Sequence, residues 1–531
     1  MTKSISATEL KALIDGTEEL ALIDVREQGN FGARHILLCA NIPLSQLEMQ
    51  VSDAIPRKTT CVVCCDDGGG LADRAAGRLA AFGYTNLSVL GGGIAAWEAA
   101  GLEIFSGLNV PSKAFGEFVE HNYGTPSVSA EELNAMLESG ENFVVLDSRP
   151  MDEYRLMNIP GGVDVPGAEL VHRVQEVAPD ETTSVVINCA GRTRSIIGAQ
   201  SLINAGVPNK VMALRNGTMG WHLAGLKLEH GQERHPPKVS VSGHQTALAR
   251  AEYAAKRFGV KRIGPATLDI WRTEKGGRSL SILDVRTVEE FEAGHIADSR
   301  HAPGGQLVQA TDVYVATQNA RVVLVDDMMV RALMTASWLE QLGWCDAYVL
   351  ESGLEGQAIL PGGREAPIFG LAECQVPNIH ATEVRSRVAE GAILIDLQRS
   401  LGYREKHAEG AWFAIRAGLD RDLEAHGIIG QVILTSPDGR LATLAAIDLI
   451  SIGKDTVVMA GGTASWEDCG FPIEAGMTKI LSPTDDVYLR AYDRTEPAQI
   501  EKAMNDYLTW EIALVDQIAK PGGVTFKTYP A

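Results

Sequence analysis

A short apolar segment that ends in an aspartate occurs four times in this chain of 531 residues. In each copy a second apolar segment ends 40 to 42 residues after that aspartate, and an Ala- and Leu-rich stretch with helical spacing follows it. Such repetition is typical of a chain built from copies of one unit, and alternating strands and helices predict a parallel sheet in each copy. The four aspartates are Asp24, Asp147, Asp284 and Asp396.

The repeat predicts an α/β protein of four tandem domains, each a mainly parallel sheet flanked by helices. We place domain 1 at residues 1–110, domain 2 at 120–235, domain 3 with a preceding linker helix (243–258) at 240–370, and domain 4 at 371–475. Residues 476–531 form a C-terminal tail. Its amphipathic stretch, Ile500–Ile518, predicts a helix that packs on the last domain.

The charge and cysteine content exclude several kinds of protein. The chain carries 47 Lys and Arg against 68 Asp and Glu, a net charge of −21 at pH 7, so we expect neither nucleic acid nor an anionic membrane as a partner. No apolar run approaches the roughly 20 residues that span a bilayer, and the N-terminus lacks the pattern of a secretory signal. Eight cysteines without the spacing of a disulfide framework favour a reducing compartment, so we expect a cytoplasmic protein.

The second apolar segments end in Cys65, Cys189, Asp326 and Ser436, at the sheet edge where parallel α/β folds bind ligands. Domain 2 continues as Cys189-Ala190-Gly191-Arg192-Thr193-Arg194-Ser195, a cysteine followed by a short loop and a helix start. Loop amides, a helix N-terminus and two guanidiniums all favour a bound anion and a lowered thiol pKa. We therefore predict Cys189 as the catalytic nucleophile, Ala190 to Ser195 as the substrate-binding loop, and Ser195 as a helix N-cap.

Several motifs recur in a fixed order: Asp-x-Arg, a Gly-His-Ile bend, the cysteine loop, and a Gly-Gly turn before Trp. They are carried by Asp24/Arg26, Asp147/Arg149, Asp284/Arg286, Gly294-His295-Ile296, the Cys189 loop, Gly92…Trp97 and Gly462…Trp466. This ordered set resembles the rhodanese (thiosulfate sulfurtransferase) superfamily over nearly the whole chain. The resemblance implies that Cys189 takes a sulfane sulfur from thiosulfate as a persulfide, releases sulfite, and passes the sulfur to cyanide or a thiol. It implies no metal and no organic cofactor.

The resemblance leaves the sulfur donor open between thiosulfate, 3-mercaptopyruvate and a glutathione persulfide. Arg192 and Arg194 favour thiosulfate, because they would hold its sulfonate, and mercaptopyruvate enzymes of the superfamily have a loop rich in Gly, Ser and Val. An alternative function is a persulfide-carrying or redox-sensing scaffold with little turnover. A phosphatase is disfavoured, since phosphatases of this fold have Cys-x5-Arg in a loop one residue longer, whereas Ser195 is the sixth residue after Cys189. An inert buried Cys189 would leave the two arginines without a role.

The other domains depart from this pattern. Cys65 precedes two aspartates and three glycines, which oppose anion binding and leave the loop flexible, so we treat it as a possible, impaired second site. Asp326 and Ser436 provide no thiol, and we predict domains 3 and 4 to be inactive. Cys61 and Cys64 lie on opposite faces of a strand, which disfavours zinc. We expect structural roles for the bend histidines and for the arginines of the Asp-x-Arg motifs, namely His295, His407, Arg26, Arg149 and Arg286.

Overall fold

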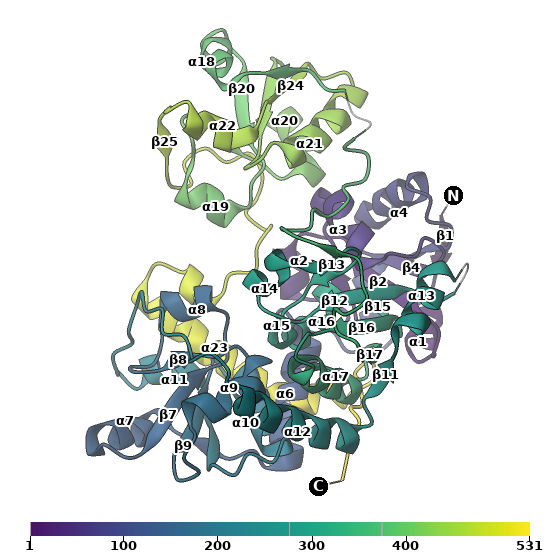
Figure 1. The fold of residues 1–531 in the computed structure, drawn as a ribbon. Coiled ribbons are helices and arrows are strands. Elements are labelled where there is room, and N and C mark those ends of the chain that lie inside the picture. The colour runs from purple at the N-terminus through teal and green to yellow at the C-terminus, as the bar shows by residue number, and fades with distance from the viewer. Residues whose placement is uncertain (1, 275–276, 373–374, 531) are drawn as a thin grey trace.

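The structure is a computed structural model that describes residues 2–274, 277–372 and 375–530. Four parallel five-stranded arrangements follow one another along the chain, and each has the same order of strands: first, fifth, fourth, second, third. We call each arrangement with its helices a unit, numbered one to four from the N-terminus (Figure 1). The predicted α/β fold with mainly parallel sheets is confirmed.

Units one and two are each built from five strands and five helices in the sheet. The elements of unit one are β1 (Lys3–Ile5), α1 (Ala7–Ile14), β2 (Leu20–Asp24), α2 (Gln28–Ala33), β3 (Ala40–Asn41), α3 (Leu47–Ala54), β4 (Cys61–Cys65), α4 (Leu71–Ala81), β5 (Leu87–Leu90) and α5 (Gly93–Ala99). Helix α6 (Val110–Tyr123) connects it to unit two. The elements of unit two are β6 (Ser127–Val128), α7 (Ala130–Ser139), β7 (Phe143–Asp147), α8 (Met151–Leu156), β8 (Val163–Asp164), α9 (Glu169–Val177), β9 (Ser184–Asn188), α10 (Thr193–Asn204), β10 (Val211–Leu214) and α11 (Gly217–Leu223).

Units three and four repeat this sequence of elements after helix α12 (Val241–Phe258). The main elements of unit three are β11 (Lys261–Ile263), α13 (Pro265–Thr273), β12 (Leu280–Asp284), α14 (Val288–Ala293), β14 (Arg300–His301), α15 (Gly304–Gln309), α16 (Thr311–Tyr314), β16 (Arg321–Val325), α17 (Val330–Leu342) and β17 (Asp346–Leu350). Those of unit four are β19 (Asn378–Ile379), α18 (Ala381–Ala389), β20 (Ile393–Asp396), α19 (Ser400–Glu405), β22 (Trp412–Phe413), α20 (Leu419–Ala425), β23 (Val432–Thr435), α21 (Arg440–Ser451), β24 (Thr456–Met459) and α22 (Gly462–Asp468). Two short antiparallel pairs close these units, β13 (His295–Ile296) with β18 (Ile359–Leu360) and β21 (His407–Ala408) with β25 (Ile473–Glu474).

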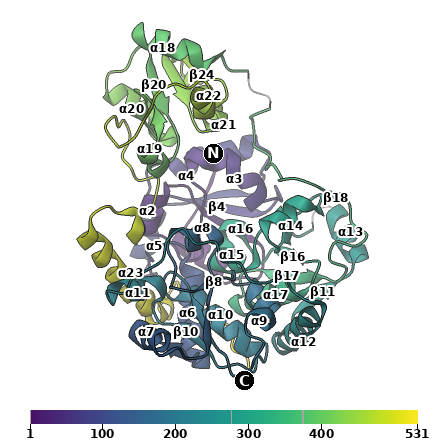
Figure 2. The same cartoon turned by 60° about the vertical axis from the view of Figure 1, so that its left-hand side comes forward.

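The units are joined by shared elements rather than by linkers alone. Strand β15 (Thr317–Gln318) of unit three pairs antiparallel with β2 and so extends the sheet of unit one. Helix α12 packs on α9 of unit two and α17 of unit three, which places these two units side by side. Unit four forms a separate lobe in both views (Figures 1 and 2) and is held to unit one by Arg416, whose guanidinium donates to both carboxylate oxygens of Glu48 at 2.6 and 3.0 Å.

The C-terminal helix does not pack where the sequence predicts. Helix α23 (Pro497–Ile518) packs against α6 and unit two, not on unit four (Figure 1). Its Met504 and Leu508 form an apolar cluster with Met219 of α11, and Ala190 packs against that cluster. The amphipathic pattern correctly marks an apolar face, but such a pattern does not specify which unit covers it.

The Asp-x-Arg motifs form buried ion pairs at the ends of the second strands. Arg149, for example, donates from Nε and Nη2 to the two carboxylate oxygens of Asp147 at 2.8 and 2.7 Å, and both side chains are buried. The same guanidinium also donates to the carbonyl oxygen of Met157. His295 and His407 stack on an aromatic ring and bond a backbone carbonyl, which confirms their structural role. No helix in the described ranges is long and apolar enough to cross a membrane.

Candidate active site

Strand register shows which residues of the four units are equivalent. The buried aspartate that ends each second strand lies opposite Cys65 in unit one, Asn188 in unit two, Val325 in unit three and Thr435 in unit four. The next residue in each chain is therefore the equivalent of Cys189. Those residues are Asp66, Asp326 and Ser436.

The position of Cys65 as the counterpart of Cys189 was predicted from segment lengths and is wrong by one residue. Backbone hydrogen bonds agree with the register, since the carbonyl oxygens of Asp66, Cys189 and Ser436 each accept an N–H from the start of the helix that follows the fifth strand. Cys65 belongs to the strand itself and faces the core, where its Sγ lies 3.5 Å from Cys39 Sγ. The error arises because unit one has two extra residues in the loop, so helix α4 starts later.

The thiol of Cys189 lies directly after β9 at the carboxyl edge of the sheet. Its residue is 2% exposed. Backbone hydrogen bonds among the described residues do not use the N–H groups of Gly191 and Arg192, and those of Thr193 to Ser195 are the first of α10, which have no intrahelical acceptor. Ser195 does not cap the helix as predicted; it lies in the first turn and its hydroxyl donates to the carbonyl oxygen of Arg192 at 2.8 Å.

The two arginines of the loop pair with carboxylates of neighbouring helices. Arg192 donates from Nε to Glu117 Oε1 of α6 at 2.6 Å and also pairs with Glu120. Arg194 donates from Nη1 and Nη2 to the two carboxylate oxygens of Glu153 on α8, at 2.8 and 2.7 Å. The sequence predicts both guanidiniums as ligands of a donor sulfonate, but Arg192 is directed toward α6 and serves to fix the loop on that helix.

The electrostatic environment of Cys189 differs from the expected one. Burial raises the pKa of the Cys189 thiol, and the charge of Arg194 and hydrogen bonds from Ser195 act in the opposite direction without cancelling it. The prediction of a lowered thiol pKa is wrong for this structure, because the guanidinium charges are already balanced by carboxylates. An anion bound at the loop would add to this balance rather than fill an empty cationic site.

Helix α23 supplies side chains that the sequence analysis did not assign to the site. Glu511 is fully buried and accepts a hydrogen bond on Oε1 from Thr193 Oγ1. Gly191 lies beneath the same helix, since a Cβ at this residue would come within 2.9 Å of Tyr507 Cε1 and 3.4 Å of Glu511 Oε2. The ammonium of Lys113, on α6, lies over the rings of Tyr507 and Trp510. The only sequence signal for this contact is the apolar face of the tail helix.

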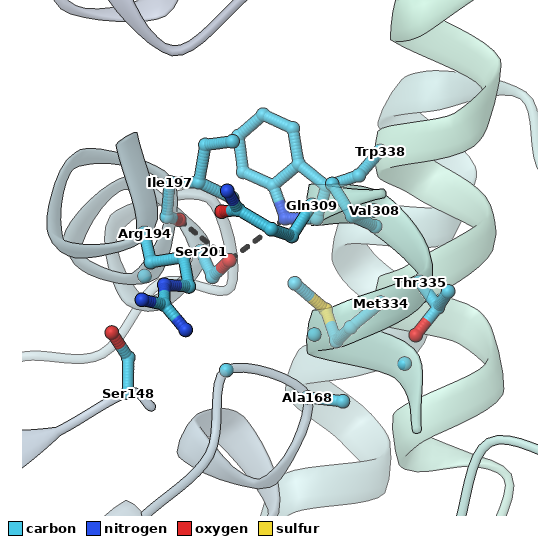
Figure 3. A pocket seen from close by; sticks show the side chains of 14 residues that line it. Ser148, Ala168, Arg194, Ile197, Ser201, Val308, Gln309, Met334, Thr335 and Trp338 are labelled. Carbon is cyan, nitrogen blue, oxygen red and sulfur yellow. Dashed lines mark hydrogen bonds between the residues drawn. The ribbon is translucent and has the colours of Figure 1, made fainter. Parts of the chain in front are cut away.

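A mainly apolar crevice of about 450 Å³ lies between units two and three (Figure 3). Helix α10 contributes Arg194 and Ser201, and α17 contributes Trp338, whose Nε1 donates to Ser201 Oγ at 2.8 Å. Small residues of unit three form part of the wall, among them Gly304 and Gly305. The crevice thus touches the backbone segment of the Cys189 loop at Arg194 but does not include Cys189 among its lining residues.

In the other three units the equivalent position holds an internal hydrogen-bond acceptor. Asp326 accepts the N–H groups of Met328, Arg331 and Ala332 at 3.1, 2.8 and 3.2 Å. Asp66 accepts the N–H groups of Gly68 and Ala72, and Ser436 Oγ accepts that of Ala442. In each case the side chain satisfies loop amides that Cys189 leaves available in unit two.

Asp24, Cys39 and Cys65 in unit one are close enough to share a ligand, with donor atoms within 4.8 Å of one another. However, Asp24 already accepts three hydrogen bonds from the guanidinium of Arg26, which neutralises its charge. Cys61 and Cys64 belong to different core clusters on opposite faces of the sheet, as predicted. A fully neutralised carboxylate with two buried thiols is a poor fit for a cation.

Comparison with known proteins agrees with this geometry. The rhodanese-like domain model matches residues 6–100, 129–224 and 269–358, which together make up more than half of the chain. The crystal structure of a thiosulfate sulfurtransferase from Pseudomonas aeruginosa is 44% identical, covers 99% of this chain and 100% of its own, and superposes with a TM-score of 0.94. Unit four lies outside the matched ranges but has the strand order of the others.

Two curated relatives match over shorter segments. A 3-mercaptopyruvate sulfurtransferase of Escherichia coli K12 is 27% identical over 170 residues, covering 27% of this chain and 59% of the relative. An HTH-type transcriptional regulator of Mycobacterium tuberculosis is 32% identical over 110 residues, covering 20% of this chain and 47% of the regulator. The chain thus spans only about half the length of these curated relatives.

Tandem parallel sheets, each with an anion-binding loop at a strand end, define a class of α/β protein, and one of the loops here begins with a cysteine. Within that class, the chain belongs to the rhodanese family.

Proposed function

We propose that this protein is a sulfurtransferase that carries sulfane sulfur on Cys189, with thiosulfate as the donor and cyanide or a thiol as the acceptor. Membership of the rhodanese family and the match to a thiosulfate sulfurtransferase over the whole chain support this class of activity. Cys189 is the one strand-end thiol among the four equivalent positions. Unit two therefore carries the proposed activity, and units one, three and four serve as scaffold.

The observation that carries the proposal is the carboxylate of Asp326 in unit three. This side chain is an anion at the position equivalent to Cys189, and it accepts the N–H groups two, five and six residues later together with the guanidinium of Arg331. A persulfide on Cys189 would place an anionic sulfur in the same setting. The corresponding groups in unit two are the amides of Gly191, Arg194 and Ser195 and the guanidinium of Arg194.

The equivalence of Arg331 and Arg194 extends to their partners. Arg331 pairs with Glu290 at 2.6 Å, and Arg194 pairs with Glu153 at 2.7 Å; both glutamates stand six residues after the buried aspartate of their unit. The charges of Cys189 and Arg194 also act on each other's pKa. Arg194 is thus held where it can stabilise an anionic sulfur, while Arg192 anchors the loop to α6.

The proposed reaction has two steps that need no external oxidant or reductant. The Cys189 thiolate attacks the outer sulfur of thiosulfate, the sulfur–sulfur bond breaks, and sulfite leaves with the bonding electrons. Loop amides and Arg194 stabilise the resulting Cys189 persulfide. The acceptor then attacks the terminal sulfur, and the Cys189 thiolate leaves with the electrons of the bond that breaks. Because Arg192 is paired with two carboxylates, donor binding falls to Arg194 and the amides.

A second candidate is a persulfide carrier with little turnover. The observation that favours it is the burial of Cys189, which is only 2% exposed beneath a loop covered by α23. A carrier of this kind would load sulfur from thiosulfate but discharge it slowly to every small acceptor.

Exposure to thiosulfate followed by intact-mass measurement tests the proposal. We expect the wild type to gain the mass of one sulfur atom and to convert thiosulfate and cyanide into sulfite and thiocyanate. Cys189→Ala should lose both the adduct and at least about 1,000-fold of the turnover, because the nucleophile is gone. Cys65→Ala is the matched control and should keep both, since Cys65 faces the core. An adduct that survives Cys189→Ala would show that another thiol carries the sulfur, and a loaded protein without turnover would favour the carrier.

A further inference from the structure

The carboxylate of Glu511 is a buried acidic group beside the Cys189 loop that the two-step reaction above does not use. It is 0% exposed, and its Oε1 accepts the hydroxyl of Thr193. Its Oε2 is buried without any hydrogen-bond partner among the described residues. An unsatisfied buried carboxylate oxygen is costly, so its retention at a reactive site points to a role in the chemistry.

Several contacts direct this free oxygen toward the loop. Oε2 would lie 3.4 Å from a Cβ at Gly191, only two residues after Cys189. The charge of Glu511 raises the pKa of the Cys189 thiol, which places the carboxylate and the sulfur within electrostatic reach of each other. Thr193 fixes the orientation of the carboxylate, because its hydroxyl occupies Oε1 and leaves Oε2 as the only available acceptor.

The surroundings of Glu511 favour a carboxylate that can take up a proton and release it again. The ammonium of Lys113 acts on Glu511 from the opposite side and is itself buried against the rings of Tyr507 and Trp510. Burial lowers the pKa of Lys113 to about 8, so this counter-charge is present at neutral pH but is not locked in an ion pair. Among the printed ion pairs of the described chain, neither Lys113 nor Glu511 has a partner within salt-bridge distance.

We infer that Glu511 is a catalytic base of the proposed sulfur transfer and that the acceptor it serves is a neutral thiol. This inference rests on the proposed function. As the thiol sulfur attacks the terminal sulfur of the Cys189 persulfide, a new sulfur–sulfur bond forms, the bond to Cys189 breaks, and Cys189 leaves as a thiolate. The proton of the attacking thiol passes to Glu511 Oε2 and from there to solvent. Cyanide attacks as an anion and releases no proton, so it does not need this base.

The test is a single-turnover discharge of full-length protein that has been loaded with thiosulfate and freed of excess donor. Glutathione and cyanide serve as the two acceptors, with the cyanide rate expressed per cyanide anion present, and loss of the sulfur adduct is followed by intact mass. General bases contribute about 100-fold or more to proton transfers. We therefore expect Glu511→Gln to discharge to glutathione at least about 100-fold more slowly than the wild type at pH 7 and to cyanide within about threefold. Glu501→Gln makes the same change at an exposed position of α23 and should leave both rates unaltered.

The pH dependence separates a base from a structural residue. A free thiol has a pKa of roughly 8.5, so above it glutathione attacks as the thiolate and the defect of Glu511→Gln should disappear. In the wild type the glutathione rate should be nearly flat between about pH 6 and 8, because the base removes the need for prior ionisation. A wild-type rate that rises tenfold per pH unit in this range would overturn the inference whether or not the variant folds.

The remaining outcomes are also decisive. An equal loss of the glutathione and cyanide rates in Glu511→Gln would assign the residue a structural role and overturn the inference. Unchanged rates with both acceptors would do the same. A wild type that neither loads sulfur nor discharges it to cyanide would instead overturn the proposed function, which keeps the two failures distinguishable.

Discussion

The loops of units two and three are built on the same frame but hold different groups at the strand end. Both follow the fourth strand, lead directly into a long helix, and carry an arginine five residues on that pairs with a glutamate of the preceding helix or its start. Unit three places the carboxylate of Asp326 among the loop amides, whereas unit two places the thiol of Cys189 there. One side chain therefore decides whether the anion site is filled internally or is available to a substrate.

The comparison also shows how the charge of each loop is balanced. Burial raises the pKa of Asp326, but Arg331 and the loop amides outweigh this effect and leave the pKa lowered. Burial raises the pKa of Cys189, and there the same type of arginine does not outweigh it. The difference follows from direct contact, since Arg331 donates to Asp326 Oδ1 at 2.8 Å, while Arg194 donates both of its terminal nitrogens to Glu153.

The largest expected effect comes from removing the arginine of unit three. Arg331 is fully buried and bonds Asp326, Glu169 and Glu290, so Arg331→Met leaves three carboxylates without their counter-charge. We expect a loss of about 3–5 kcal/mol in the free energy of unfolding of this region, measured by urea denaturation. Arg272→Met, which breaks a partly exposed pair with Asp298, should cost at most about 1 kcal/mol. Equal losses in the two variants would break the analogy between the units.

The equivalent change in unit two should affect the chemistry instead. Arg194→Met removes the guanidinium that we place beside the anionic sulfur, so we expect loading from thiosulfate to slow by about 100-fold or more. Arg192→Met is the matched comparison, because Arg192 pairs with Glu117 and Glu120 and anchors the loop. It should lower the unfolding temperature more than it lowers the loading rate. A larger loss of loading in Arg192→Met would reverse the roles given to the two arginines.

The smallest expected effect concerns the third strand of unit two, compared with that of unit one. Asp164 and Asn41 are equivalent, since each lies opposite the buried aspartate of its unit. Asn41 donates to two backbone carbonyl oxygens, whereas Asp164 Oδ1 is buried without a partner in the described chain, and burial raises the pKa of Asp164 to about 8. Asp164→Asn should therefore reproduce the arrangement of unit one.

The sign of this prediction follows from linkage. The folded state keeps the Asp164 proton up to about pH 8 and the unfolded state loses it near pH 4, so wild-type stability should fall as pH rises between these values. We expect Asp164→Asn to raise the free energy of unfolding by about 1–3 kcal/mol at pH 8 and by less at pH 5, measured by urea denaturation at both pH values. A gain that does not depend on pH would contradict the assignment of the proton.

Local patterns were sufficient for most of the fold and for the central residue of the candidate site. The spacing of buried aspartates and strand ends predicts the repeated parallel sheets, because each strand and helix has its own apolar period. The Asp-x-Arg pairs are equally local, since the two residues are only two positions apart. The pattern fails in unit one, where a longer loop shifts the apparent strand end from Asp66 to Cys65, and only the pairing of β2 with β4 reveals the shift.

The sequence by itself determined the family, the parallel units and the cysteine that begins one anion-binding loop. The tertiary structure decided the surroundings of that cysteine: Arg192 is directed to α6, Arg194 to α8, and Glu511 comes from a helix more than 300 residues further along the chain. The physical reason is that strand and helix periods are written in neighbouring residues, whereas the partner of an apolar helix face or a buried charge is chosen by the free energy of packing distant segments together.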